Sequence, residues 1–158
     1  PAAAVKLEGA EPETLVVIDR LVRSGIPVMG HLGLTPQAVH QLGYRRQATD
    51  PVAQERLLRQ ADALLAAGCF ALVIEHVPEA LAQRLQQRLP IPVIGIGAGP
   101  YCDGQVLVTA DLLGISAWQP PFAQPLVNLR QQALPALRQW VAAQRDPTRS
   151  TASAAPHC

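Results

Sequence analysis

The chain has 158 residues, of which 49% are hydrophobic and only 4% aromatic, and its formal net charge is +1. These values predict one domain of ordinary size with an aliphatic core, and they argue against binding to nucleic acid, a membrane surface or an acidic partner. No apolar run is long enough to span a bilayer, and no signal peptide is evident. Cys69, Cys102 and Cys158 share no metal-ligand spacing, so we expect reduced thiols in a cytoplasmic protein.

Apolar runs alternate with amphipathic segments along the chain, and most of them end at glycine or proline. The apolar runs predict strands at residues 2–8, 27–31, 70–75, 91–96 and 105–109. The amphipathic segments predict helices at residues 13–24, 51–67 and 78–89, with a short helix from Pro36 toward Gly43. Residues 126–145 are also typical of a helix, but Pro135 should break it or start a second one.

The repeated order of strand and helix predicts an α/β fold with a parallel sheet and short right-handed crossovers. A doubly wound sheet and part of an eight-stranded (β/α)8 barrel both fit this order. In either fold the carboxyl ends of the strands lie at one edge of the sheet, where ligands bind.

Glu75 is the most informative single residue, because it ends the uninterrupted apolar run at residues 71–74. A carboxylate at the end of a buried strand can act as a general base. The alternative is a structural role, in which Glu75 lies at a solvated strand end or caps the helix that starts near Pro78.

Two charged residues and a histidine end the first two predicted strands. Lys6 and Glu8 are two residues apart on one strand, so their side chains point to the same side. They could form a plain salt bridge; alternatively, Glu8 could bind a hard cation while Lys6 binds a substrate carboxylate. His31 could be a core histidine bonded to backbone, or it could donate a hydrogen bond to a substrate oxygen.

The glycine-rich residues 95–99 do not match a phosphate-binding motif, because they lack both Gly-x-Gly-x-x-Gly and Gly-Lys-Ser/Thr. Tight turns and a close approach to a ligand explain these glycines better. Asp103 and Asp111 are interpreted as turn and helix-cap residues.

Several motifs occur in a characteristic order along the chain. They are His-Leu-Gly-Leu-Thr-Pro at 31–36, Gly-Tyr at 43–44, Ile-Glu at 74–75 with a proline at 78, Ile-Pro-Val-Ile-Gly-Ile-Gly-Ala-Gly at 91–99, Asp-Gly-Gln at 103–105 and Asp-Leu-Leu-Gly at 111–114. Together they resemble the ketopantoate hydroxymethyltransferase family, and the resemblance covers nearly all of the chain up to Phe122.

The resemblance implies a TIM barrel, of which this chain would supply strands four to eight with their helices. It implies transfer of a hydroxymethyl group from the co-substrate 5,10-methylenetetrahydrofolate to 3-methyl-2-oxobutanoate, with Mg²⁺, in pantothenate biosynthesis. By motif match, Glu75 corresponds to the proton acceptor, Glu8 to a metal ligand and Lys6 to a substrate contact. His31 lies at the family's active-site strand end and is assigned to substrate binding. A homo-oligomer is also implied.

The sequence departs from the family pattern in ways that bear on activity. The first three strands of the family, which carry two metal-binding aspartates and a substrate-binding serine, have no counterpart here. We therefore interpret residues 1–145 as the C-terminal part of a catalytic domain that is inactive by itself, followed by a disordered tail at residues 146–158. The alternatives are a non-catalytic remnant that binds a protein partner or the keto acid, and another metal-enolate lyase of the same superfamily.

Overall fold

The computed structural model describes residues 2–35 and 45–145. Five parallel strands form one sheet, and their spatial order follows their order along the chain. The strands are β1 (Val5–Glu8), β2 (Val28–Gly33), β3 (Ala71–Glu75), β4 (Val93–Ile96) and β5 (Gly104–Gln105). The predicted α/β class with a parallel sheet is therefore confirmed.

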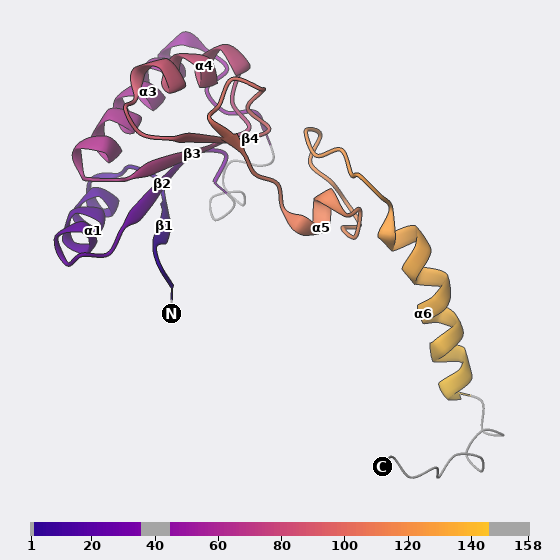
Figure 1. Cartoon of the computed structure of the whole chain (residues 1–158). Helices are drawn as coiled ribbons and strands as arrows, with labels where there is room; N and C mark the ends of the chain where they lie inside the picture. Colours follow the sequence, from indigo (N-terminus) through magenta and orange to yellow (C-terminus); the bar gives the residue numbers. More distant parts are fainter. Residues whose placement is uncertain (1, 36–44, 146–158) are drawn as a thin grey trace. The chain divides into compact units, whose positions relative to one another are not determined.

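Three helices connect the strands and cover one face of the sheet (Figure 1). They are α1 (Pro12–Arg23), α3 (Pro51–Ala66) and α4 (Glu79–Arg88). Two further helices follow the sheet along the chain, α5 (Thr109–Leu112) and α6 (Leu129–Arg145). The chain divides into two compact units, Pro1–Leu107 and Val108–Cys158, and the sheet lies entirely in the first. None of the helices in the described ranges has the length and apolar character needed to cross a membrane.

Local sequence explains where these helices begin and end. The side chain of Asp50 accepts a hydrogen bond from the backbone N–H of Ala53 at 2.9 Å, and Pro51 occupies the first turn of α3. Gly68 ends the same helix with a φ of 92°, a left-handed conformation that glycine adopts without steric cost. The residues on either side of the predicted helix therefore account for both of its ends.

The core lies between the sheet and its helices. Aliphatic side chains from both layers are fully buried there, and they include Ile18, Leu64, Leu72, Ile74, Leu81, Leu85 and Val93. All residues of β3 are buried, which explains why its sequence is apolar without alternation. Burial of aliphatic surface on this scale is the main term that holds the sheet and helices together.

Two sequence predictions in the C-terminal part are wrong. The strand expected at 105–109 ends at Gln105, and Thr109 instead begins α5. The break expected at Pro135 does not occur, because α6 continues through it. No residue of α6 is buried, so the carbonyl that loses its partner four residues before Pro135 can bond to water instead. The short helix expected near Pro36 and the tail at 146–158 lie outside the described residues.

Asp103 is more than the turn residue that its sequence suggests. Its carboxylate accepts hydrogen bonds from the backbone N–H of Val93 at 2.8 Å and from the side-chain amide of Gln86 at 2.9 Å. Both hydrogen bonds hold the pKa of Asp103 below its usual range, and the bond from Val93 has the larger effect. Asp103 therefore fastens the start of β4 to the loop that follows that strand.

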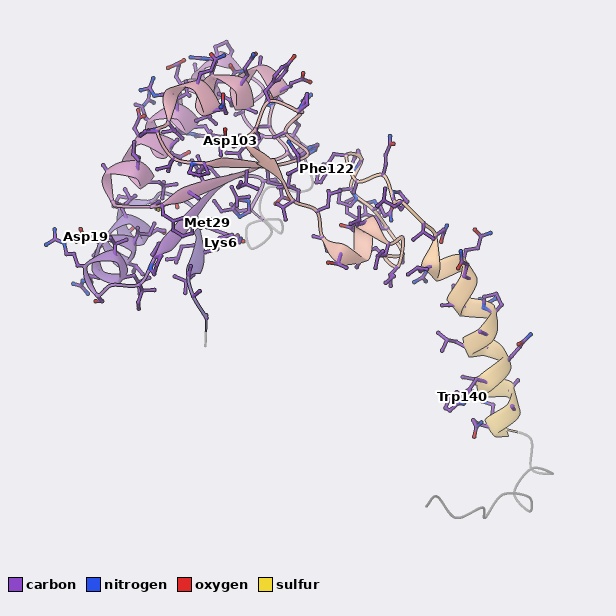
Figure 2. All side chains as sticks on the ribbon, in the orientation of Figure 1. Lys6, Asp19, Met29, Asp103, Phe122 and Trp140 are labelled. Carbon is purple, nitrogen blue, oxygen red and sulfur yellow. The ribbon has the colours of Figure 1, made fainter. Side chains whose placement is uncertain are left out.

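Replacing Asp103 by asparagine should lower stability near neutral pH, because the charged acceptor becomes a neutral one. The folded-state pKa is depressed, so this contribution is present above the unfolded value of about 3.9 and is lost as pH falls through the folded value. Denaturant midpoints measured at pH 7 and at successively lower pH below the unfolded value test this, and the two proteins should approach each other as pH falls. Asp19→Asn is the control, because Asp19, which is labelled in Figure 2, forms only an exposed pair with Arg23 at 2.9 Å. An equal loss in both variants would contradict the assignment.

Candidate functional site

The register of the sheet gathers the carboxyl ends of three strands. Glu8 of β1 is opposite His31 of β2, and Gly33 of β2 is opposite Glu75 of β3. A side chain at Gly30 would meet Leu64 of α3, so alternate residues on β2, including His31, face away from the helices. Figure 2 shows the labelled side chain of Lys6 on this same face. All four residues singled out from the sequence therefore lie together on the face opposite the helices.

Lys6, Glu8 and His31 are in direct contact. Lys6 Nζ lies 3.1 Å from His31 Nδ1 and 3.5 Å from Glu8 Oε1, and His31 Nδ1 lies 3.7 Å from Glu8 Oε1. The side chain of Lys6 is 44% exposed, whereas that of His31 is 2% exposed. The salt bridge between Lys6 and Glu8 that was one of the two sequence interpretations is present. The partial exposure of Lys6 leaves its ammonium accessible to a ligand.

Glu75 joins this group from the third strand. Its Oε2 atom lies 3.4 Å from His31 Nε2, and its side chain is 12% exposed. The contact is close enough for an ion pair but does not have the geometry of a hydrogen bond, and His31 Nε2 has no hydrogen-bond partner among residues 2–35 and 45–145. The structure therefore does not support the alternative that His31 is a core histidine bonded to backbone.

The backbone around Glu75 is held in place on both sides. The carbonyl oxygen of Glu75 accepts a hydrogen bond from the N–H of Leu34 at 2.8 Å. The next residue, His76, has a φ of 51° and donates its N–H to the carbonyl of Ile96 at 2.8 Å. Positive φ is uncommon outside glycine and is often found at functional sites. Glu75 therefore sits on a rigid strand end rather than on a loop.

The sequence suggested no role for His76. Its positive φ draws attention to it in the structure. Burial lowers the pKa of His76, the charge of Arg46 lowers it further, and the charge of Glu75 opposes them. The ring is therefore biased toward its neutral form next to Glu75. No sequence pattern predicts positive φ at a histidine, so this feature could be found only in the structure.

Glu8 is the candidate metal ligand that the sequence suggested. Within the part of the chain that the structure describes, no three or more His, Cys, Asp or Glu side chains are grouped so that they could hold a metal ion. Glu8 provides carboxylate oxygens, which are the ligands that Mg²⁺ prefers, and Mg²⁺ commonly uses one or two carboxylates together with water and substrate. Glu8 thus fits one position of a magnesium site whose remaining protein ligands would come from elsewhere.

Comparison with known proteins identifies the family. The sequence profile described as ketopantoate hydroxymethyltransferase matches residues 1–148. The chain belongs to this family. The resemblance inferred from the sequence motifs is therefore confirmed.

Several relatives are close in sequence. The chain is 69% identical over 156 residues to a 3-methyl-2-oxobutanoate hydroxymethyltransferase of Parasynechococcus marenigrum, covering 99% of this chain and 58% of that protein. It is 71% identical over 140 residues to the protein of the same name in Prochlorococcus marinus, covering 89% of this chain and 52% of that protein. The chain therefore spans little more than half the length of the relatives that it matches.

A solved structure shows a weaker similarity. The crystal structure of a putative phosphonomutase from Burkholderia cenocepacia matches with a TM-score of 0.48 and 16% sequence identity, covering 90% of this chain and 59% of that one.

Proposed function

We propose that this chain forms part of a 3-methyl-2-oxobutanoate hydroxymethyltransferase. The proposed reaction joins the one-carbon unit of 5,10-methylenetetrahydrofolate to 3-methyl-2-oxobutanoate and gives 2-dehydropantoate, as in pantothenate biosynthesis. The observation that carries this proposal is the convergence of Lys6, Glu8, His31 and Glu75 on one face of the sheet in a chain of this family. A salt bridge that only stabilised β1 would need neither His31 nor Glu75.

Each of the four residues has a proposed role that suits its chemistry. Glu75 is the base, because its carboxylate lies on a rigid strand end and is 12% exposed. Lys6 binds the substrate carboxylate, because the ammonium has three N–H donors, two of which can serve His31 and Glu8 while the third serves the ligand. His31 contributes to substrate binding next to Lys6, whose Nζ atom lies 3.1 Å from His31 Nδ1, and Glu8 is the proposed metal ligand.

The proposed chemistry begins when Glu75 removes the proton from C3 of the keto acid. Water releases the one-carbon unit from tetrahydrofolate as formaldehyde, and its two protons go to the two folate nitrogens. The enolate carbon then bonds to the formaldehyde carbon, and the new alkoxide takes up the proton that Glu75 removed. Lys6 holds the carboxylate so that C3 faces Glu75, which is the positioning that makes proton transfer efficient. We propose Mg²⁺ as the cofactor, with Glu8 as one ligand; when bound, it would make C3 of the keto acid more acidic.

We also propose that the sheet is a partial TIM barrel, equivalent to strands four to eight of the family. The parallel sheet with sequential strand order and helices on one face supports this, because a doubly wound sheet carries helices on both faces. The homo-oligomer and the cytoplasmic location stay predictions.

The 158-residue chain by itself should not catalyse the reaction. Its described residues provide Glu8 as a proposed metal ligand, and the two metal-binding aspartates and the substrate-binding serine that the family resemblance implies have no counterpart in it. Turnover would be measured with Mg²⁺, 3-methyl-2-oxobutanoate and methylenetetrahydrofolate. The comparison is a joined protein, in which this chain follows the part of the Parasynechococcus marenigrum relative that it does not match.

The joined protein should be active under conditions in which the chain alone is not. Efficient turnover by the chain alone would show that the proposed site is incomplete or misplaced. An inactive but folded joined protein would instead support the non-catalytic remnant, and binding of the keto acid by calorimetry would then show whether the pocket survives.

A further inference from the structure

His31 occupies a central position that the proposed roles of Lys6 and Glu75 do not explain. It contacts both of them: Nδ1 lies 3.1 Å from Lys6 Nζ, and Nε2 lies 3.4 Å from Glu75 Oε2. The ring is 2% exposed, so solvent cannot freely satisfy either nitrogen. An imidazole buried between a cation and a carboxylate has its orientation and its tautomer restricted by both neighbours.

The contact with Lys6 determines the tautomer. An ammonium has donors but no acceptor, so Nδ1 of His31 must accept the hydrogen bond from Lys6. A neutral imidazole carries one N–H and one acceptor nitrogen, which places the hydrogen of His31 on Nε2. Nε2 is the buried atom without a hydrogen-bond partner among the described residues, and its nearest acidic group is Glu75.

We propose that His31 is a positioning residue that transmits the placement of Lys6 to the carboxylate of Glu75. This inference rests on the proposed function, since it assigns Glu75 as the base. Lys6 fixes the Nε2–H tautomer, and the Nε2–H group then directs one carboxylate oxygen of Glu75. The second oxygen of Glu75 is left to meet the substrate. At 3.4 Å the two atoms are close enough, but the Nε2–H group and the carboxylate are not aligned as a hydrogen bond requires. A small rotation of the Glu75 carboxylate together with a shorter separation would form that bond, and active-site hydrogen bonds are often long or poorly aligned until substrate binds.

Two substitutions at this position separate the two contacts. In His31→Gln, the amide nitrogen can take the place of Nε2 and donate to Glu75, but Lys6 loses its acceptor. In His31→Asn, the shorter side chain can accept from Lys6 through its oxygen but cannot reach Glu75. The joined protein described above carries each variant, and kcat and KM for the keto acid are measured with Mg²⁺ present.

The two variants should fail in opposite ways. His31→Asn should lower kcat by about 10-fold to 100-fold, the cost of losing an orienting partner or misplacing a reacting group, and leave KM near its parent value. His31→Gln should keep kcat within about 10-fold of the parent and raise KM, because Lys6 is less well held. A purely structural histidine would make both variants change kcat and KM alike, and that result would overturn the proposal.

The tautomer provides a readout that does not depend on turnover. The joined protein labelled with ¹⁵N-histidine gives long-range ¹H–¹⁵N correlations, and the signals missing in His31→Gln identify His31. We expect the pattern of the Nε2–H tautomer, and the Nδ1–H pattern would overturn the proposal. If the parent protein fails to catalyse the reaction, the proposed function fails, but the spectrum still decides the arrangement of Lys6, His31 and Glu75.

Discussion

Replacing Glu75 by glutamine should lower proton exchange at C3 of 3-methyl-2-oxobutanoate by about 10²-fold or more, which is the scale of general-base catalysis. Glutamine has almost the same size as glutamate and can accept a hydrogen bond, but it cannot take up the proton. Binding of the keto acid should be retained, because Lys6 is unchanged. Exchange is followed by NMR in D₂O with the joined protein and Mg²⁺, in the absence of folate, so that carbon–carbon bond formation does not contribute.

The matched control is Glu55→Gln, which makes the same chemical change on the surface of α3. Glu55 pairs with Arg84 at 2.7 Å, and its side chain is 55% exposed, so the loss should affect neither exchange nor folding by much. Exchange at the parent rate in Glu75→Gln would remove Glu75 from the mechanism. It would then be a structural residue between β3 and the helix that follows Pro78.

Much of the fold could be predicted because the sheet is regular. β3 is buried on both faces, so its sequence is apolar throughout, and this pattern is recognisable without any contact information. Alternation along β1 also placed Lys6 and Glu8 on one side, as the salt bridge between them confirms. Parallel strands then bring their carboxyl ends to one edge, which explains why residues from three strands far apart in the sequence were predicted to meet.

The details that escaped prediction depend on contacts with the backbone or between strands. The hydrogen bond from Val93 to Asp103 joins a side chain to a backbone group ten residues away, and nothing in residue type specifies it. The end of β5 was also missed, because Val106 and Val108 favour a strand by composition but are exposed in the structure. Similarly, the sequence placed His31 at the site without indicating that it lies between Lys6 and Glu75.

Gly33 provides the last test, because it lies where β2 and β3 end together. Its φ is 95°, and a side chain there would overlap the backbone carbonyl of Glu75, the group that accepts a hydrogen bond from Leu34 at 2.8 Å. Gly33→Ala should therefore displace the strand end that carries the proposed base. A displacement of about 1 Å can cost about 10²-fold in rate, so we expect C3 exchange to fall on this scale although no catalytic side chain is changed.

Gly25→Ala separates this effect from ordinary backbone strain. Gly25 has a similar φ of 82°, but a side chain there would meet nothing within 4 Å. Its substitution should cost about 1–2 kcal/mol in the free energy of unfolding, the penalty for a left-handed residue with a side chain, and leave exchange unchanged. Gly33→Ala should be less stable than Gly25→Ala because it adds a steric overlap to the same strain. Denaturant unfolding and C3 exchange, measured for both variants in the joined protein, distinguish the two. Equal stability and equal exchange would mean that the contact between Gly33 and Glu75 does not fix the position of the base.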